Sequence, residues 1–233
     1  MDQSTDLEFS FAKLVAMGDS LGMRTLMATF FPCLVVCCFL ASDSPLRAES
    51  EKKPLFNGKD LTGWKSVGSA VWRVVGEKIR GGQDGDPKRS GLLMTETTFK
   101  DFEIELDFKI DEHGKYNSGL YLRHERGKRQ RRGYQVNIGR GAAEEYVGLY
   151  TDRWLDKGDE HDAYRKILEW NHLRVSARGN HIQVWLNGHQ IVDHIDKNAT
   201  PDLLAPGVIA IQTYGAEGHA GWVEFKNIFI REF

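Results

Sequence analysis

The sequence predicts an all-β fold, a jelly-roll sandwich of two antiparallel sheets. Short runs in which apolar and polar residues alternate recur along the chain, and almost no segment has a helical pattern. The clearest run is Asp101 to Asp111, where apolar residues at even positions alternate with charged residues at odd positions. Because successive side chains point to opposite faces of a strand, this strand should bury one face in a core and leave the other polar.

Turn residues divide the rest of the chain into short strands. Gly76 separates the first two, and residues 81–87 form a Gly- and Asp-rich loop. Gly179-Asn180 and Asn187-Gly188 suit tight hairpin turns, because Gly and Asn adopt positive φ readily. Residues 151–169 are charged and irregular, and one helical turn is the most regular structure expected there. Besides the 101–111 strand, the expected strands are Val71–Val75, Lys78–Arg80, Gly91–Thr95, Asn117–Arg123, Tyr134–Ile138, Val147–Tyr150, Asn171–Ala177, His181–Leu186, Gln190–His194, Val208–Tyr214 and Trp222–Ile230.

Tryptophans are scattered among these strands, as expected of a two-sheet core. Trp supplies much of the buried area of a sandwich, so most of them should be core residues. The alternative for one or two of them is an exposed position in which a sugar ring stacks on the indole. The five tryptophans in question are Trp64, Trp72, Trp170, Trp185 and Trp222.

The first 48 residues resemble a targeting segment. Met23-Arg24 precedes a mostly apolar run, and Ala48 ends the short polar stretch that follows it. A basic start, a short apolar core and a small exit residue are typical of a secretory signal peptide. A retained membrane anchor is the alternative interpretation.

We therefore expect three segments. Residues 1–22 precede the true start of translation, residues 23–48 are the signal peptide, and residues 49–233 form a single jelly-roll domain. This organisation predicts a protein that is secreted or periplasmic, in a bacterial cell envelope. A membrane would be a partner only if the signal segment were retained.

Cysteine and charge content exclude several function classes. Cys33, Cys37 and Cys38 all lie in the apolar run, so the mature domain has no disulfide, thiol nucleophile or Cys-ligated metal. Alternatively, Cys37 or Cys38 in the apolar run is the acceptor of a lipid, as in a lipoprotein. The chain carries 31 Lys/Arg and 33 Asp/Glu, and residues 1–48 account for the acidic surplus. A neutral domain is not expected to bind nucleic acid, and the basic 128–132 run is interpreted as a solvated loop.

Metal ligation has little support in the spacing of the histidines. The eight His residues form no His-x-x-x-His pair, and the acidic 156–162 segment does not fit an EF-hand loop. We expect no cofactor, and a divalent metal is the alternative. His124, beside Arg123 and Glu125, is the histidine most worth testing for function.

Seven short segments in order resemble one known family. It is the 3-keto-disaccharide hydrolase domain family, also described as 3-keto-glucoside 1,2-lyases and 3-keto-2-hydroxyglucal hydratases. Each segment alone is weakly specific, but their order over residues 54–233 is specific. The segments are Leu55–Trp64, Asp101–Glu103, Asn117–Gly119 with Arg123, Gly133–Val136, Glu169–Asn171 with Leu186–Gly188, Gly207–Gln212 and Val223–Ile228.

The resemblance implies a concanavalin-like jelly roll in a secreted bacterial protein that acts on saccharides. In the implied chemistry, a ketone at C3 acidifies the C2 hydrogen, a base removes that proton and the C1 substituent leaves. Water then adds across the double bond. Such a site needs a base, a group that stabilises the enolate and an acid for the leaving oxygen. The chain has no Gly-x-Ser-x-Gly sequence that would indicate a serine nucleophile instead.

The polar face of the 101–111 strand supplies the first candidate catalytic residues. Glu103, Glu105 and Asp107 share that face, and Glu105 is the preferred base because it is central. Arg123 is expected on the polar face of the next strand with Tyr121, where a guanidinium would contact an oxyanion or sugar hydroxyls. The alternatives are a solvated strand face for the carboxylates and an ion pair from Arg123 to Glu103 or Glu105.

The remaining candidates are amide and phenol side chains that would bind the sugar. Here the chain departs from the family pattern, which usually has Glu at the position of Gln135 and His at the position of Tyr214. An amide cannot accept a proton as a base, and a tyrosine does not ionise readily near neutral pH. With Glu103, the expected substrate-binding residues are Asn117, Tyr121, Gln135, Asn137, Gln212 and Tyr214.

The sequence thus predicts a secreted enzyme that cleaves 3-keto-glycosides by C2 proton abstraction, elimination and hydration. Its partner would be a mono- or oligosaccharide. A non-catalytic carbohydrate-binding module is the main alternative, because Gln135 and Tyr214 replace residues that the family usually has. A structural or interaction domain at the cell surface is the third interpretation.

Overall fold

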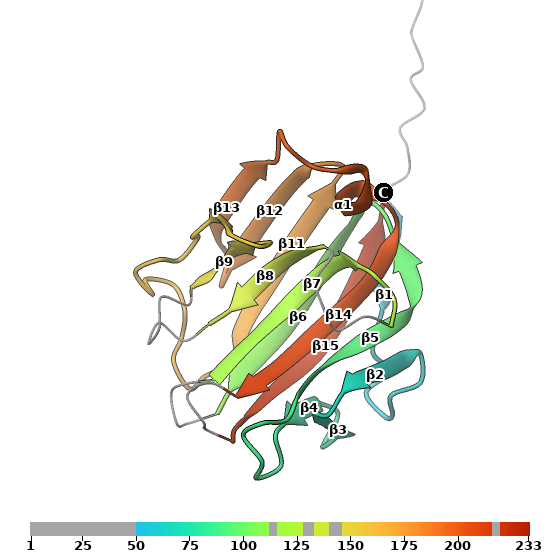
Figure 1. Ribbon diagram of the computed structural model, residues 1–233, viewed down its shortest axis with the longest axis vertical. Coiled ribbons are helices and arrows are strands. Elements are labelled where there is room, and N and C mark those ends of the chain that lie inside the picture. The colour runs from blue at the N-terminus through green and yellow to red at the C-terminus, as the bar shows by residue number, and fades with distance from the viewer. Residues whose placement is uncertain (1–49, 112–115, 128–132, 140–145, 216–219) are drawn as a thin grey trace, which may run out of the picture. The chain divides into compact units, whose positions relative to one another are not determined.

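The computed structural model describes residues 50–111, 116–127, 133–139, 146–215 and 220–233. In these ranges the chain is almost entirely β, with one short helix, α1 at Pro201–Leu204. All paired strands run antiparallel, and they form two sheets that lie one behind the other in Figure 1. This arrangement confirms the predicted all-β sandwich of two antiparallel sheets.

The first sheet, sheet A, has the order β13-β12-β11-β6-β15-β4-β3, and β1 pairs with β15 beside this path. Its strand β6 is the long alternating strand of the sequence. The bounds are β1 Lys53–Pro54, β3 Val71–Val74, β4 Ile79–Gly82, β6 Phe102–Ile110, β11 Asn171–Arg178, β12 His181–Leu186, β13 His189–Ile195 and β15 Trp222–Glu232.

The second sheet, sheet B, has the order β10-β9-β8-β7-β14-β5-β2. Its central strands β8, β7 and β14 are antiparallel neighbours. The bounds are β2 Trp64–Gly68, β5 Ser90–Phe99, β7 Tyr116–His124, β8 Tyr134–Ile138, β9 Val147–Tyr150, β10 Trp154–Asp156 and β14 Gly207–Gly215.

One hydrophobic core fills the space between the sheets. Ile104, Leu106 and Phe108 of β6 face it from sheet A, and Leu120 and Leu122 of β7 face it from sheet B. All five side chains are at most 1% exposed. Because alternate residues point the other way, each of these strands also presents a second set of side chains on the outside of the sandwich.

The two hairpin dipeptides take the backbone conformation that their residues favour. Asn187 and Gly188 both have positive φ between β12 and β13, as a type I′ turn requires. Between β11 and β12, Gly179 has positive φ and Asn180 does not, which fits a type II′ turn. Local turn chemistry therefore sets the register of this part of sheet A.

Several local expectations were incomplete or wrong. No helical turn forms within 151–169, where the chain instead makes β10 and a series of turns. The strands β1 and β2 and the helix α1 had no distinct pattern in the sequence. Most tryptophans are not core residues. Trp64 and Trp72 contact the core, whereas Trp170, Trp185 and Trp222 lie half-buried beside Lys226, Arg174 and Arg80, respectively.

The most consequential difference concerns β6 and β7, which are consecutive along the chain. They were expected to lie side by side with their polar faces in common. Instead β6 pairs with β11 and β15 in sheet A, and β7 pairs with β8 and β14 in sheet B. Their polar faces therefore point away from each other, on opposite outer surfaces of the sandwich.

Candidate functional site

The outer face of sheet B carries most of the side chains predicted to bind substrate. On β7, Leu120 and Leu122 point into the core, so Asn117 and Tyr121 point outward. The same alternation turns Gln135 and Asn137 of β8 outward, opposite Tyr134, Val136 and Ile138. On β14, Ile209 and Ile211 point inward, so Gln212 and Tyr214 point outward. Six predicted residues from three adjacent strands thus share one surface.

Three amide side chains on this surface are joined by hydrogen bonds. The Nε2 of Gln135 donates to the Oε1 of Gln212 over 3.1 Å and to the Oδ1 of Asn137 over 3.3 Å. The Nδ2 of Asn137 donates to the backbone carbonyl of Tyr146 over 2.8 Å. We call Gln135, Asn137 and Gln212 the amide cluster. Each amide in it has its orientation set by a neighbour, which suits it to present donors and acceptors to a polar ligand.

Gly119 of β7 makes this cluster possible. It lies in register between Gln212 on β14 and Asn137 on β8. A Cβ at this position would come within 2.4 Å of the Nε2 of Gln135. Because glycine has no side chain, Gln135 can reach across β7 to Gln212, and the cluster spans three strands.

An aromatic group flanks the amide cluster at the β9–β10 edge. Tyr150 is the register partner of Gln135, and Trp154 is the register partner of Tyr150. The rings of Tyr150 and Trp154 meet edge to face with centroids 5.1 Å apart, and Tyr146 lies 5.5 Å from Trp154. Sugars are bound in proteins by amide hydrogen bonds and by aromatic faces that cover their C–H groups, and this edge offers both.

A second apolar cluster lies on the other side of the amide cluster. Leu92, Met94, Tyr121, Val208 and Ala210 pack together on the outer face and are at most 3% exposed. Beyond the amide cluster along β14, Tyr214 is 48% exposed, and it pairs in register with Asn117 of β7. The face therefore passes from buried apolar side chains through the amide cluster, in which Gln135 and Asn137 are 4% and 6% exposed, to an exposed tyrosine.

Arg123 does not lie on this face. Its φ is +55°, and the pairing of β7 with β14 shifts register at this point. The side chain is fully buried and ion-paired with Asp101 over 3.1 Å. It also donates to the backbone carbonyls of Lys100, Gly179 and Leu203. The bulge interrupts the alternation, so the expectation that Arg123 shares the polar face of Tyr121 was wrong, and its ion-pair partner is Asp101 rather than Glu103 or Glu105.

The same bulge brings His124 onto the outer face of sheet B. His124 is the register partner of Val208, and its ring meets that of Tyr121 edge to face at 5.0 Å. Its Nδ1 lies 2.7 Å from the carbonyl of Glu125. Because a carbonyl only accepts, Nδ1 carries the proton and Nε2 keeps a lone pair. Burial is the main cause of a lowered pKa for His124, so the ring is neutral at neutral pH.

Glu103, Glu105 and Asp107 lie on the opposite side of the molecule, on the outer face of sheet A. Glu103 accepts hydrogen bonds from Arg174 over 3.2 Å and from Arg231 over 2.9 Å.

Glu105 and Asp107 are paired on the same face. Glu105 is ion-paired with Lys52, and Asp107 accepts from Asn227 and contacts the Nδ1 of His172 over 2.8 Å. The structure therefore does not bring Glu105 or Glu103 together with the amide cluster, because the whole sandwich separates them.

The described outer face of the central strands of sheet B presents neutral hydrogen-bonding side chains. No outward residue of β7, β8 or β14 within the described ranges is Asp or Glu. His124 is the group on these strands whose ordinary pKa lies nearest to neutral pH, and burial lowers the pKa of this ring. In the part of the chain that the structure describes, no three His, Cys, Asp or Glu side chains are placed to hold a metal ion. Nor is any helix there long and apolar enough to cross a membrane.

Comparison with family models connects this chain to a known group of proteins. Residues 51–231 match the model of the 3-keto-alpha-glucoside-1,2-lyase-like domain. The chain belongs to this family. The match confirms the resemblance seen in the sequence segments, and it covers both sheets except the last residue of β15, Glu232. A comparison with curated protein sequences finds no match.

Solved structures share the fold of this family member. A protein from Parabacteroides distasonis named "putative glycosyl hydrolase" is 24% identical with a TM-score of 0.61, and the match covers 78% of this chain and all of that one. A Bacillus subtilis protein of unknown function with a galectin-like fold is 14% identical, with a TM-score of 0.59 and 78% and 94% covered. The carbohydrate binding module CBM66 from Bacillus subtilis is 18% identical, with a TM-score of 0.51 and 73% and 96% covered. These likenesses establish a jelly-roll fold.

Sequence reasoning missed three contributors to this face and the position of a fourth. Tyr150 ends a predicted strand and Trp154 lies in a segment that looked irregular, and their positions relative to Gln135 follow from strand register alone. Gly119 was noted only as part of a family segment. His124 was singled out, but its place beside Tyr121 depends on the bulge at Arg123. The spacing of Tyr146, Tyr150 and Trp154, four residues apart, is a signal that could have drawn attention to this edge.

Proposed function

We propose that this protein binds a saccharide on the outer face of sheet B. The observation that carries the proposal is the amide cluster of Gln135, Asn137 and Gln212 beside the aromatic pair Tyr150 and Trp154. The amides provide both donors and acceptors for sugar hydroxyls, and the rings provide apolar faces for sugar C–H groups. The family and the carbohydrate-related names of its structural neighbours support the same ligand class.

The substrate that family membership favours is a 3-keto-glycoside. In the proposed reaction, a base takes the proton from C2, and the electrons of the C–H bond form a double bond between C2 and C1. The bond from C1 to the leaving oxygen breaks, and that oxygen takes up a proton. Water then adds across the double bond to give a free 3-keto sugar. The amide N–H groups would stabilise negative charge on the C3 oxygen while it develops.

Non-catalytic carbohydrate binding is the second candidate, and Gln135 is the observation that favours it. A carboxylate in this place could accept the C2 proton, whereas the amide cannot. Under this proposal, the face has kept its hydrogen bonds to sugar but lost a base.

The two candidates are separated by one pair of measurements. The domain is incubated with methyl 3-keto-α-glucoside, with and without added divalent metals, and products are followed by mass spectrometry while binding is followed by calorimetry. An unsaturated or free keto sugar supports the enzyme, and binding without product supports the binding module. Absence of both would overturn the saccharide proposal. A Gln135→Ala variant that binds as tightly as the wild type would show that the site lies elsewhere.

We also propose that the domain works outside the cytoplasm, in the cell envelope or beyond it. The signal-peptide pattern of residues 23–48 supports this proposal, although these residues lie outside the described ranges. Amino-terminal sequencing of protein recovered from an expressing bacterium tests it. A mature chain that begins near residue 49 is the expected result, and a chain that keeps residues 23–48 in the cytoplasm contradicts it.

A further inference from the structure

The loop between β13 and α1 contains the sequence pattern of a glycosylation acceptor. Residues 198–200 read Asn-Ala-Thr, in which an asparagine is followed two positions on by threonine with no proline between them. No other asparagine of the chain has Ser or Thr at that position. The pattern alone is weakly specific, because transfer of a glycan also requires that the asparagine lie on an accessible surface.

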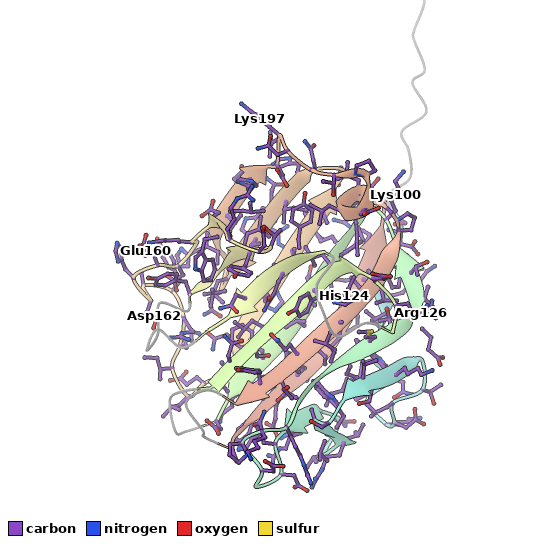
Figure 2. The ribbon with its side chains drawn as sticks, viewed as in Figure 1. Lys100, His124, Arg126, Glu160, Asp162 and Lys197 are labelled. Atoms are coloured by element: carbon purple, nitrogen blue, oxygen red, sulfur yellow. The ribbon has the colours of Figure 1, made fainter. Side chains whose placement is uncertain are left out.

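The tip of this loop is accessible. Lys197, Asn198 and Thr200 are exposed, whereas Asp196 at the base of the loop is buried. Figure 2 shows Lys197, the residue before Asn198, beyond the ends of β12 and β13. Modifying enzymes reach exposed loop tips more easily than other parts of a domain, because little packing has to be broken there.

Asp196 fixes the base of the loop without help from the asparagine side chain. Its Oδ2 accepts from the hydroxyl of Tyr134 over 3.0 Å, and its Oδ1 accepts from the backbone N–H of Asn198 over 2.9 Å. Its backbone carbonyl accepts from the Nδ2 of Asn180 over 2.9 Å. The contacts of Asp196 therefore hold the turn, and the side chain of Asn198 is not needed to form it.

The side chains of Asn198 and Thr200 are not used by the local structure. An asparagine in a turn usually bonds to the backbone two residues on, and a threonine before a helix usually caps the first amides of that helix. Thr200 is the N-cap of α1, yet its hydroxyl makes no capping hydrogen bond. Within the described ranges, no group is hydrogen-bonded to the side-chain amide of Asn198. The amide and the hydroxyl that define the pattern are thus both exposed and available to a transferase.

We propose that Asn198 is the acceptor of an N-linked oligosaccharide. The co-reactant is an oligosaccharide joined through a diphosphate to a polyprenol. The amide nitrogen of Asn198 gives up one proton to a base of the transferase and forms a bond with C1 of the first sugar. The bond from C1 to the diphosphate oxygen breaks, and polyprenyl diphosphate leaves with that electron pair. This inference rests on the proposed export of the domain, since such transferases act outside the cytoplasm.

A glycan on this loop would shield one edge of sheet A and leave the saccharide face open. β13 ends the strand order of sheet A, and Ile195 at its end is 55% exposed. An exposed strand edge can pair with another chain, and a bulky polar group beside it hinders that pairing. The amide cluster belongs to β8 and β14 of sheet B, so the glycan and a bound saccharide would not compete.

The first test is glycan transfer to the purified, folded, full-length chain. A bacterial single-subunit oligosaccharyltransferase and a polyprenyl-diphosphate-linked oligosaccharide are supplied, and intact mass and peptide mapping locate the product. The wild type and Thr200→Ser should gain one oligosaccharide at Asn198, whereas Asn198→Gln and Thr200→Ala should gain none. Purified protein bypasses export, so this experiment tests the acceptor alone.

Asn57 offers a matched control in the same chain. Lys59→Thr, made in the Asn198→Gln variant, gives exposed Asn57 the same pattern. The Asn57 side chain is already engaged, because its Nδ2 donates to Asp60 over 2.8 Å and its Oδ1 accepts from two backbone N–H groups. Transfer to Asn57 should be at least about fivefold less than to Asn198, since a hydrogen bond must first break.

Three results of this test would count against the inference. A folded wild type that stays unmodified, while a known acceptor protein is glycosylated in the same reaction, would overturn it. A modification that survives Asn198→Gln would place the acceptor elsewhere. Equal transfer to Asn57 and Asn198 would overturn the role assigned to the free side chain.

The second test examines the protein recovered from the organism that encodes it. A mature chain that begins near residue 49 and carries sugar at Asn198 supports the inference, and an unmodified mature chain overturns it. A chain that keeps residues 23–48 in the cytoplasm contradicts the proposed export, and the inference with it. Saccharide binding enters neither test, so failure of the proposed binding site would leave both results unchanged.

Discussion

At the scale of single residues, the roles of Gln135 and Glu105 are set by what surrounds each one. Gln135 is 4% exposed and makes hydrogen bonds to two other amides on the outer face of sheet B. Glu105 lies on the outer face of sheet A beside Lys52 and the His172 ring. Glu105 is half-buried and already ion-paired, and ion pairs of this kind are common on outer strand faces that have no function. The geometry therefore favours Gln135, and not Glu105, as a residue that touches substrate.

Replacing each of these residues should separate them. Gln135→Ala removes the hub of the amide cluster, and we expect saccharide affinity to fall by about fivefold, the equivalent of about 1 kcal/mol for one hydrogen bond. Glu105→Gln keeps size and removes only the surface charge, so binding and any turnover should stay within twofold of wild type (roughly the effect of a weak surface ion pair). Calorimetry and product assays on both variants check this. Loss of turnover in Glu105→Gln with binding intact would instead restore Glu105 as the base.

His124 makes stability depend on pH in a predictable direction. Burial lowers its pKa in the folded state below the ordinary value of 6.5. The unfolded chain therefore binds more protons than the folded chain as the pH falls through the ordinary value, and acid favours unfolding. The contribution of His124 is fully present above that value and is lost below it, with a slope of at most about 1.4 kcal/mol per pH unit.

Chemical denaturation between pH 5 and pH 8 measures this slope. The wild type should lose stability on acidification below about pH 6.5, and His124→Gln should lose less of it. His181→Gln is the matched control, because that ring is partly exposed and bonded to Asp193 on the outer face of sheet A. An acid slope unchanged by His124→Gln would show that other groups cause it.

At the scale of elements, strand register creates the site. Gly119 of β7 separates Gln212 from Asn137 by the width of one strand and leaves the space that the Gln135 amide occupies. A glycine in the middle of a strand usually weakens it, and here its absence of side chain opens a path between β8 and β14. The cluster thus depends on three strands being neighbours and in this register.

Gly119→Ala should affect binding more than folding. The added methyl would meet the far end of the Gln135 side chain, which can rotate away, so unfolding free energy should change by less than about 1 kcal/mol. The displaced amide can no longer bridge to Gln212, and saccharide affinity should fall by about fivefold. Gly85→Ala is the control, since Gly85 has φ +84° in open space and lines a pocket beside β3 and β4. Its backbone strain should lower stability while binding is unchanged.

The elements themselves were largely readable from the sequence. Apolar alternation gave the strands β6, β8, β9 and β12 to within a residue or two, because side-chain period follows directly from strand geometry. Turn residues gave the hairpins around β12. Neither signal states which strand lies beside which, so the consecutive strands β6 and β7 were assigned to one sheet when they belong to two.

At the scale of the whole molecule, Arg123 holds together segments that are distant in the sequence. Its guanidinium is buried and contacts Asp101 in the turn between β5 and β6, Gly179 in the β11–β12 hairpin and Leu203 of α1. In Figure 1 these parts gather at the end of the sandwich where α1 lies. The Arg123 guanidinium therefore connects β7 of sheet B to the β5–β6 turn and the β11–β12 hairpin at the end of sheet A.

Arg123→Ala should destabilise the fold strongly. Removing this fully buried side chain leaves a cavity and breaks its ion pair with Asp101 and its hydrogen bonds to three carbonyls, at a cost of about 3–5 kcal/mol. For a domain of this size that is a fall in Tm of roughly 6–20 °C. Arg178→Ala is the control, since Arg178 is exposed and stacks on Phe233, a contact of about 0.5–1 kcal/mol. Thermal denaturation of both variants checks the difference. Equal falls in Tm would mean that the buried contacts of Arg123 contribute no more to stability than the exposed contact of Arg178.

The sequence by itself determined most of the strands, the jelly-roll class, the family and the polar side chains of β7, β8 and β14 that share a face. These follow from period-two alternation and from local segments, which depend on neighbours along the chain. Only the tertiary structure decided that Glu105 and Gln135 lie on opposite faces, that a bulge turns Arg123 inward and brings His124 beside Tyr121, and that Tyr150 lies beside Gln135. Sheet membership and register are set by long-range pairing and core packing, which leave no local trace in the order of the residues.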